Sequence, residues 1–152
     1  MNPSFLTLKD IKFTKIHIEV DSKVKIGASD FDFKDSLIGC DIKHGAMKNE
    51  ENSWWLLMGF ANSNDGDDVK KCPYLFEFQA LGIISIDEQF EPANLKEKLV
   101  FESGSALIYG AIREMTINLT SRSIPGPLML PTPMFKDTFE EQMKKKESKK
   151  KR

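Results

Sequence analysis

The sequence is poor in cysteine, histidine and long apolar runs, and each shortage excludes a class of protein. Cys40 and Cys72 are the only cysteines in 152 residues, so we expect two free thiols, with a structural disulfide as the alternative. His17 and His44 have no carboxylate or cysteine at ligand spacing in the sequence, which predicts neither a metal site nor a catalytic site. The longest apolar run, residues 54–61, is far shorter than the roughly 20 residues of a membrane helix.

A signal peptide is also lacking, because Lys9, Asp10 and Lys12 interrupt the place of its apolar core. We therefore expect a cytoplasmic protein that does not insert into membranes. The length supports one domain with a single core. No enzyme motif is present, so we expect a protein without catalytic activity and without a cofactor.

Charge is distributed unevenly along the chain. Residues 1–143 contain 15 basic and 22 acidic residues, a net charge of −7, whereas residues 144–152 contain seven basic and one acidic, a net charge of +6. We predict a domain over 1–143 followed by a disordered basic tail over 144–152. The tail either keeps the protein soluble or binds nucleic acid, but it has no aromatic residues for base stacking, so we do not expect a nucleic-acid partner.

Alternating polarity predicts four strands in the first half of the chain. Ile16, Ile18 and Val20 alternate with polar residues, and Ile38, Cys40, Ile42 and His44 share the face of a second strand. A third strand covers residues 54–61. It is joined to a fourth over 74–86 by the turn "NSNDGDD", which is typical of an antiparallel hairpin. Gly82 predicts a bulge or bend in the last strand.

Helical spacing replaces alternation in the second half. Leu107, Ala111, Ile112, Met115 and Leu119 form an apolar stripe that we expect to pack on the sheet, with Ser103 or Ser105 as the cap. A second helix is predicted to begin near Phe135. The fold class is therefore α+β, a four-stranded antiparallel sheet with two C-terminal helices packed on it.

Aromatic residues and prolines occur together in unusual places. Phe31 and Phe33 lie among aspartates, which should resist deep burial. Phe135 and Phe139 share one helix face directly after "PGPLMLPTPMF", a stretch with four prolines. A row of strand aromatics, Tyr74, Phe76 and Phe78, fits either the core or a binding surface. Filling the core is the alternative for all of these aromatic residues, and it is the weaker interpretation for Phe31 and Phe33.

The C-terminal third resembles the SecB protein-export chaperones. The matching residues are "REMTINLTSR" (113–122), followed by Leu128, Leu130, Phe135 and Phe139, and upstream "YLFEFQALGIISI" is similar to the last strand of that family. The resemblance covers residues 10–143 and is strongest in the last seventy. It implies a SecB-like fold, assembly as a homotetramer built from two dimers, and binding of unfolded precursor proteins for delivery to the translocation ATPase SecA.

The resemblance also implies roles for individual residues. The expected client-binding residues are Phe31, Phe33, Tyr74, Phe76, Phe78, Leu128, Met129, Met134, Phe135 and Phe139. The expected SecA-docking residues are Glu19, Leu75 and Glu77. The residues expected at an oligomer interface are Tyr109, Ile112, Arg113 and Thr116, with a packing role inside one subunit as the alternative.

Three departures from the family pattern weaken the SecA partnership. Lys15 stands where familiar members carry an acidic residue, the tail is basic, and Ser123 replaces a common glycine. Two alternatives to an export holdase therefore stay open. One is an adaptor dedicated to a single partner such as an antitoxin, and the other is an accessory protein that binds nucleic acid through its tail.

Overall fold

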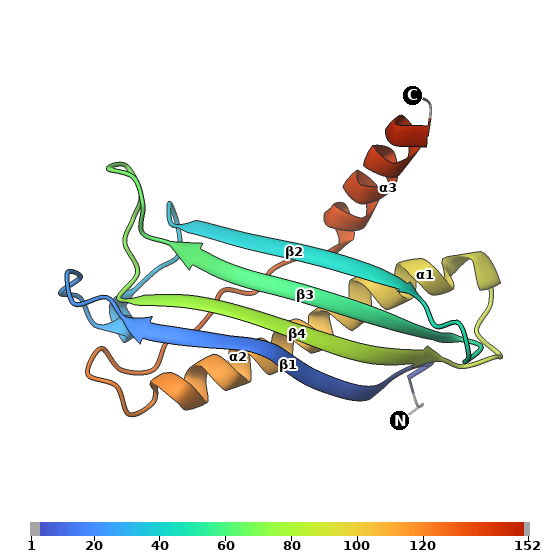
Figure 1. Ribbon diagram of the computed structural model, residues 1–152, viewed down its shortest axis with the longest axis horizontal. Helices are drawn as coiled ribbons and strands as arrows, with labels where there is room; N and C mark the ends of the chain where they lie inside the picture. Colours follow the sequence, from blue (N-terminus) through green and yellow to red (C-terminus); the bar gives the residue numbers. More distant parts are fainter. Residues whose placement is uncertain (1–3, 151–152) are drawn as a thin grey trace.

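The computed structural model describes residues 4–150, and its central element is a four-stranded antiparallel sheet (Figure 1). The strands are β1 (Leu6–Val20), β2 (Leu37–Ala46), β3 (Ser53–Ser63) and β4 (Tyr74–Ile86). They lie in the order β1–β4–β3–β2. Strands β2, β3 and β4 thus form a meander, and β1 pairs with β4, so that β1 and β2 are the two edges. The predicted hairpin between β3 and β4 is confirmed.

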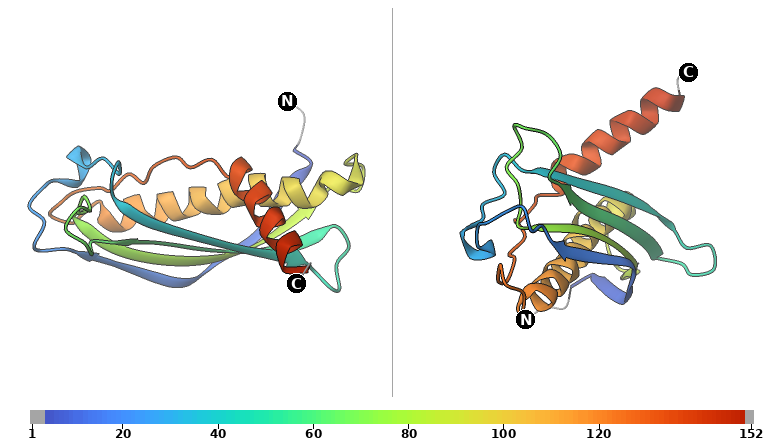
Figure 2. Two further views of the ribbon diagram at one scale, coloured as in Figure 1. Left: turned by 90° about the horizontal axis from the view of Figure 1, so that it is seen from above. Right: turned by 60° about the vertical axis from the view of Figure 1, so that its left-hand side comes forward.

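The helical stretch from α1 to α2 lies on one face of this sheet and forms a second layer (Figure 2). A short 3₁₀ turn, η1 (Ala28–Asp30), lies between β1 and β2. After β4, a second 3₁₀ turn, η2 (Ala93–Leu95), leads into α1 (Lys96–Leu99), the π turn η3 (Val100–Gly104) and α2 (Ser105–Thr120). These three follow without a break, so the long helix begins well before the predicted caps Ser103 and Ser105. The α+β prediction is confirmed.

The last helix, α3 (Lys136–Lys150), projects past the β2 edge of the sheet (Figures 1 and 2). It touches the rest of the chain through its first two turns, where the Phe139 ring lies 5.3 Å from that of Phe101 and Gln142 Nε2 donates to the carbonyl of Ile42 at 3.1 Å. Residues 144–150, which we expected to be disordered, continue the helix, and 151–152 lie outside the described residues. Within 4–150, no helix has both the length and the apolar character needed to cross a membrane.

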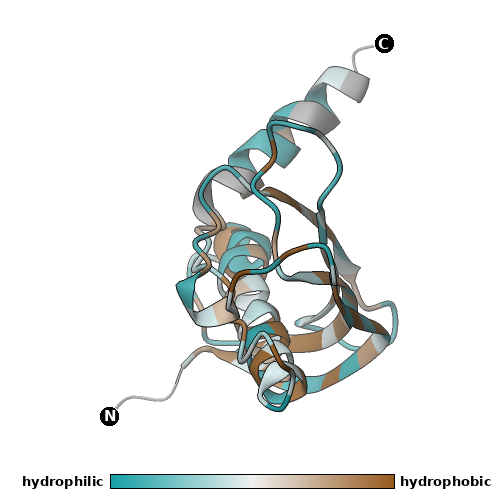
Figure 3. Cartoon of the chain, turned by 90° about the vertical axis from the view of Figure 1, so that its left-hand side faces the viewer, coloured by the Kyte–Doolittle hydropathy of each residue, from teal (hydrophilic) through white to brown (hydrophobic). Residues whose placement is uncertain are grey.

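The core lies between the sheet and α2. Hydrophobic residues follow the strands, whereas the drawn part of α3 is mostly hydrophilic (Figure 3). The fully buried side chains include Leu56, Met58, Phe78, Ile84, Ile108 and Ile112. Burial of this apolar surface is the main force that holds α2 on the sheet.

The buried face of α2 differs from the predicted stripe. Leu107 and Leu119 are 44% and 43% exposed, whereas Ile108 and Thr116 are fully buried. The helix has apolar residues on two flanks, so helical spacing alone could not identify the inner one. The inner flank contains hydroxyl groups, but burial does not leave that of Thr116 unsatisfied, since it donates to the Ile112 carbonyl at 2.8 Å.

Gly82 does not mark a bulge in β4. The irregularities of this pairing lie in β1 instead, between Leu8 and Asp10 and between Phe13 and Lys15. A Cβ atom at Gly82 would lie 2.6 Å from the Cδ1 atom of Ile108. The glycine therefore lets α2 approach the sheet closely.

Strand β1 leaves apolar side chains uncovered at its edge. Ile16 pairs with Phe78 and Val20 with Tyr74, so both share the face that carries α2. They are nevertheless 48% and 47% exposed, so no element of the described residues covers these positions of the edge strand. The prediction of a half-buried face thus holds only for Ile18, which packs partly against the core.

Candidate functional site

The Pro-rich segment 125–135 crosses the helix-bearing side of the molecule in an extended path fixed by side-chain hydrogen bonds. The hydroxyl groups of Tyr74 and Tyr109 donate to the carbonyls of Gly126 and Pro131, each at 2.6 Å. The Leu128 amide donates to Thr120 Oγ1 at 2.9 Å. Proline has no N–H to satisfy, so few anchors are enough to hold this path.

Side chains of this segment alternate between the core and the solvent. Leu128 and Leu130 are 0% and 1% exposed, whereas Met129 and Met134 are 60% and 77% exposed. One side of the segment therefore completes the core, and the other presents flexible apolar side chains to the solvent.

An apolar pocket of about 170 Å³ lies beside the exposed Met134. Its aromatic wall is made of rings in contact, with the Tyr109 ring edge-on to Phe60 at 5.2 Å and 6.0 Å from Phe135. It is lined by Cys40, Ile42, Phe60, Tyr109, Pro133, Met134 and Phe135. No charged side chain lines it, so the pocket suits an apolar group of roughly one side chain's size.

Next to this pocket, α3 rests on the edge strand through a small aromatic cluster. The His44 side chain is 4% exposed and lies between the rings of Phe101 and Phe139, at 5.3 and 6.5 Å. Its Nε2 lies 2.9 Å from the Glu97 carboxylate of α1. The carboxylate therefore gives the buried imidazole a polar partner, and the cluster fixes the base of α3 beside the pocket.

Only part of the expected client-binding set reaches this surface. Met129 and Met134 are exposed, Phe135 lines the pocket, and Phe139 is half-buried at its edge. The structure places the others in the core, where a client would not touch them: Tyr74, Phe76, Phe78 and Leu128 are at most 2% exposed. The strand aromatics thus take the core role that we kept as their alternative.

Phe31 and Phe33 lie apart from the pocket and pack on each other, with ring centroids 4.8 Å apart. Phe31 is 9% exposed despite its flanking aspartates. Two contacts account for this burial: Lys70 Nζ lies 5.3 Å from the centre of the Phe31 ring, and the Ala28 amide donates to the Pro125 carbonyl at 2.6 Å. The expectation that aspartates would keep this ring near water is therefore wrong.

The residues expected at an oligomer interface face inward. Tyr109, Ile112 and Thr116 are at most 3% exposed within one chain, and Arg113 is half-buried. Tyr109 contributes to the pocket instead. Burial raises the pKa of its phenol, which keeps the hydroxyl protonated as a donor to Pro131.

Sequence reasoning missed four pocket residues, Cys40, Ile42, Phe60 and Pro133. The alternation pattern places Cys40 and Ile42 on one strand face, so the sequence could predict that they share a surface. It could not predict that this face lies beside the Pro-rich segment, because that depends on β2 being the edge strand.

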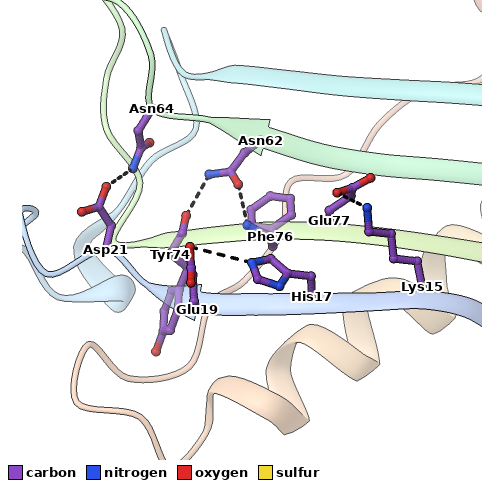
Figure 4. A network of polar contacts seen from close by, with 9 residues as sticks. All are labelled: Lys15, His17, Glu19, Asp21, Asn62, Asn64, Tyr74, Phe76 and Glu77. Atoms are coloured by element: carbon purple, nitrogen blue, oxygen red, sulfur yellow. Dashed lines mark hydrogen bonds and ion pairs between the residues drawn. The ribbon is translucent and has the colours of Figure 1, made fainter.

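The opposite face of the sheet carries the residues expected to dock SecA. Glu19 and Leu75 line an open hollow of about 730 Å³ together with Asp21, and Glu77 forms an ion pair with Lys15 (Figure 4). The amide of Asn64 hydrogen bonds to the Asp21 carboxylate and lowers its pKa, helped by the backbone of Lys23. The hollow keeps acidic character, but Lys15 offsets the charge of Glu77.

Nothing in the described residues groups three or more His, Cys, Asp or Glu side chains as a metal site would. The described surface offers apolar contact area on the helix-bearing side and a polar, partly acidic hollow on the other side.

Comparison with known proteins identifies the fold. The chain is similar to the SecB-like chaperone Rv1957 of Mycobacterium tuberculosis, solved in complex with a ChAD peptide from the antitoxin HigA1 (Rv1956), with a TM-score of 0.56 and 16% identity. That alignment covers 84% of this chain and 87% of the other. The fold is thus SecB-like, as the sequence resemblance implied.

A second similar structure is a protein of unknown function from Streptococcus agalactiae. Its TM-score is 0.53 at 8% identity, and the alignment covers 83% of this chain and 96% of that one. By sequence, no protein-family model and no curated protein matches the chain. The likeness is therefore one of backbone architecture, maintained with little sequence in common.

Proposed function

We propose that this protein is a chaperone of the SecB-like type, which binds unfolded polypeptide on the Pro-rich side and prevents its premature folding. The observation that supports this most is the apolar pocket beside Met134, a side chain that is 77% exposed. Binding rather than chemistry is the activity, and cytoplasmic precursors of exported proteins are the proposed clients.

Weak, adaptable contacts fit this role. Methionine repacks around different partners, so Met129 and Met134 suit a surface that accepts many sequences. A client side chain that buries about 100 Å² gains roughly 2.5 kcal/mol at about 25 cal/mol per Å². A few such contacts, reduced by the ordering of the client, give an affinity in about the micromolar range.

We further propose that the protein assembles as a homotetramer, although not through the residues first expected. Leu107 and Leu119 of α2 are more than two-fifths exposed, as are Ile16 and Val20 of the edge strand β1. These exposed apolar side chains offer a second copy surface to cover. Four copies that hold one long client would raise the avidity by orders of magnitude.

Delivery of bound clients to SecA has less support than client binding, because Lys15 pairs with Glu77 on the sheet face that would contact SecA. A second candidate function is an adaptor that serves one partner. The peptide from an antitoxin that accompanies the similar Mycobacterium structure favours it. Both candidates use the same pocket and differ in the range of clients.

The first experiment measures refolding of a slow-folding reporter protein in the presence of this chain. We expect a several-fold molar excess to delay refolding, and the variant Met134→Asp, which places a charge at the pocket mouth, to delay it less. Ile124→Asp is a matched control, since it also replaces an exposed apolar side chain by a carboxylate but lies outside this pocket. Refolding at an unchanged rate with the wild-type protein would reject the chaperone proposal.

Two further measurements separate the candidates. A pull-down from cell extract should recover many precursors for an export chaperone and one dominant protein for a dedicated adaptor. The native mass in solution should correspond to four chains, and the double variant Leu107→Glu/Ile16→Glu should lower it. Retention of the tetramer mass by that variant would exclude the proposed interface.

A further inference from the structure

Arg113 of α2 has no anionic partner within the described part of the chain. Its Nε atom is buried without a hydrogen-bond partner, although the residue as a whole is half-buried. The polar contact that it does make is from Nη2 to the sulfur of Met129, at 3.7 Å. None of the ion pairs of the described residues includes it.

This environment is costly for a guanidinium group. The group has five N–H donors in a planar fork that fits a carboxylate, and a thioether sulfur is only a weak acceptor. The buried Nε–H therefore goes without an acceptor at some cost in stability, while the rest of the half-buried group stays within reach of water. A ligand that brings a carboxylate to Arg113 would offset that cost, so the unbound protein is prepared for an anion at this point.

The position of Arg113 relates it to the client pocket. It lies four residues after Tyr109, one helical turn along the same flank, and Tyr109 lines the pocket. The pKa of the Tyr109 phenol, which burial raises, is held down in part by the charge of Arg113, so the two groups are close. Met129, the other neighbour of the guanidinium, is 60% exposed, so this side of the guanidinium lies near the solvent.

We propose that Arg113 binds a carboxylate of the polypeptide whose apolar side chain occupies the pocket. Spacing makes the proposal specific. Cβ atoms four residues apart on a helix are about 5–6 Å apart, and side chains two residues apart on an extended chain share one face about 6.6 Å apart. The acidic residue should therefore stand two positions from the anchoring residue. The inference rests on the proposed polypeptide binding.

The test uses fluorescence anisotropy with labelled peptides of about ten residues that carry one central Phe and are otherwise polar and uncharged. One peptide has Glu two positions from the Phe, a second has Gln there, and a third has the Glu at the adjacent position. All three are amidated at the C-terminus. A fourth ends two positions after the Phe with a free carboxylate, which distinguishes a chain end from an acidic side chain.

We expect the Glu peptide to bind the wild-type protein about tenfold more tightly than the Gln peptide or the peptide with the shifted Glu. Arg113→Gln should abolish this preference, and Arg113→Lys should retain part of it, since lysine keeps the charge without the fork. The free-carboxylate peptide should bind as tightly as the Glu peptide only if chain ends are recognised.

The outcomes distinguish this inference from the proposed function. Equal binding of the Glu and Gln peptides to the wild-type protein overturns the role of Arg113 and leaves the chaperone proposal standing. Absence of binding by every peptide overturns both. A preference that survives in Arg113→Gln assigns the carboxylate to another residue and also overturns it. The comparison of peptides on the wild-type protein needs no variant, so it stands even if Arg113→Gln does not fold.

Discussion

The connection between β1 and β2, residues 21–36, and the Pro-rich segment 125–135 both carry apolar side chains outside regular structure, yet they expose them differently. The first turns Phe31 inward until it is 9% exposed. The second buries Leu128 completely and leaves Met134 77% exposed beside a pocket. The first segment therefore withdraws its Phe31 ring from a partner, although its Ile26 is 43% exposed, whereas the second presents Met134 at a pocket lined by aromatic rings.

The difference follows from how the backbone hydrogen-bonding groups of each segment find partners. In 21–36, the carboxylates of Asp21 and Asp32 each accept the amide two residues later at 3.0 Å, which turns the chain tightly. In 125–135, prolines remove donors and fix φ, so the chain stays extended and its side chains alternate. Tight turns let rings pack on each other, whereas an extended path separates a buried side from an exposed one.

The largest expected effect comes from the buried side of the Pro-rich segment. Leu128→Ala should lower the free energy of unfolding by about 3 kcal/mol, because it leaves a cavity in the core. Met129→Ala should change the free energy of unfolding by less than about 0.5 kcal/mol, since the Met129 side chain, next to Leu128 in the sequence, is mostly in solvent. Urea denaturation followed by circular dichroism measures both. Similar losses for the two variants would show that the segment has no distinct sides.

The second prediction compares the two segments directly. Met134→Asp should weaken binding of an aromatic-rich peptide by about tenfold with little change in stability. Phe33→Ala should have the opposite effects. It should lower the free energy of unfolding by about 2 kcal/mol, because the half-buried ring packs on the core, and it should leave peptide binding unchanged. Anisotropy and urea denaturation are measured on the same samples. A loss of affinity in Phe33→Ala would restore the connection 21–36 as part of the site.

A smaller effect is expected from the anchors of the extended path. Tyr109→Phe removes the hydrogen bond to the Pro131 carbonyl and should lower the free energy of unfolding by about 1 kcal/mol. Amide hydrogen exchange near residue 132 should become faster. Tyr74→Phe, which removes the matching bond to Gly126, is the control for an anchor at the other end of the segment. Unchanged exchange in both would mean that proline alone fixes the path.

The last prediction is a pH dependence at the buried Cys72, which has no effect near neutral pH. Burial raises the pKa of Cys72 from 9.0 to about 11, so the unfolded chain releases this proton more readily than the folded one. This contribution to stability is fully present below about pH 9 and is lost as the pH rises toward 11. Thermal denaturation of the wild type should show that decline, and Cys72→Ala should show less of it. Equal slopes would rule out Cys72 as the source.

The sequence predicted the strands well because alternation is a local property. The strand predicted over residues 74–86, where aromatic and polar residues alternate from 76 to 79, matches the bounds of β4. The Asp-Gly turn before it predicted the hairpin, and the Pro-rich stretch predicted a stiff apolar connection. Each of these depends on neighbours a few residues apart, so it can be read without knowing the fold.

The candidate site was predicted less well, because it depends on pairs that are distant in the chain. Cys40 and Phe135 meet only because β2 is the edge strand beside the Pro-rich segment. Leu107 and Ile108 are equally apolar, so the sequence does not show which of them is buried. Contact with the sheet decides which flank of α2 faces the core. The burial of the Phe31 ring involves a contact with Lys70, which lies on the connection between β3 and β4.

By itself, the amino-acid sequence determined a four-stranded antiparallel sheet, a helical C-terminal part and an extended apolar segment between its helices. Only the tertiary structure decided which apolar side chains remain at the surface. The physical reason is that secondary structure follows from local spacing and backbone chemistry, whereas exposure depends on which distant element covers a given side chain.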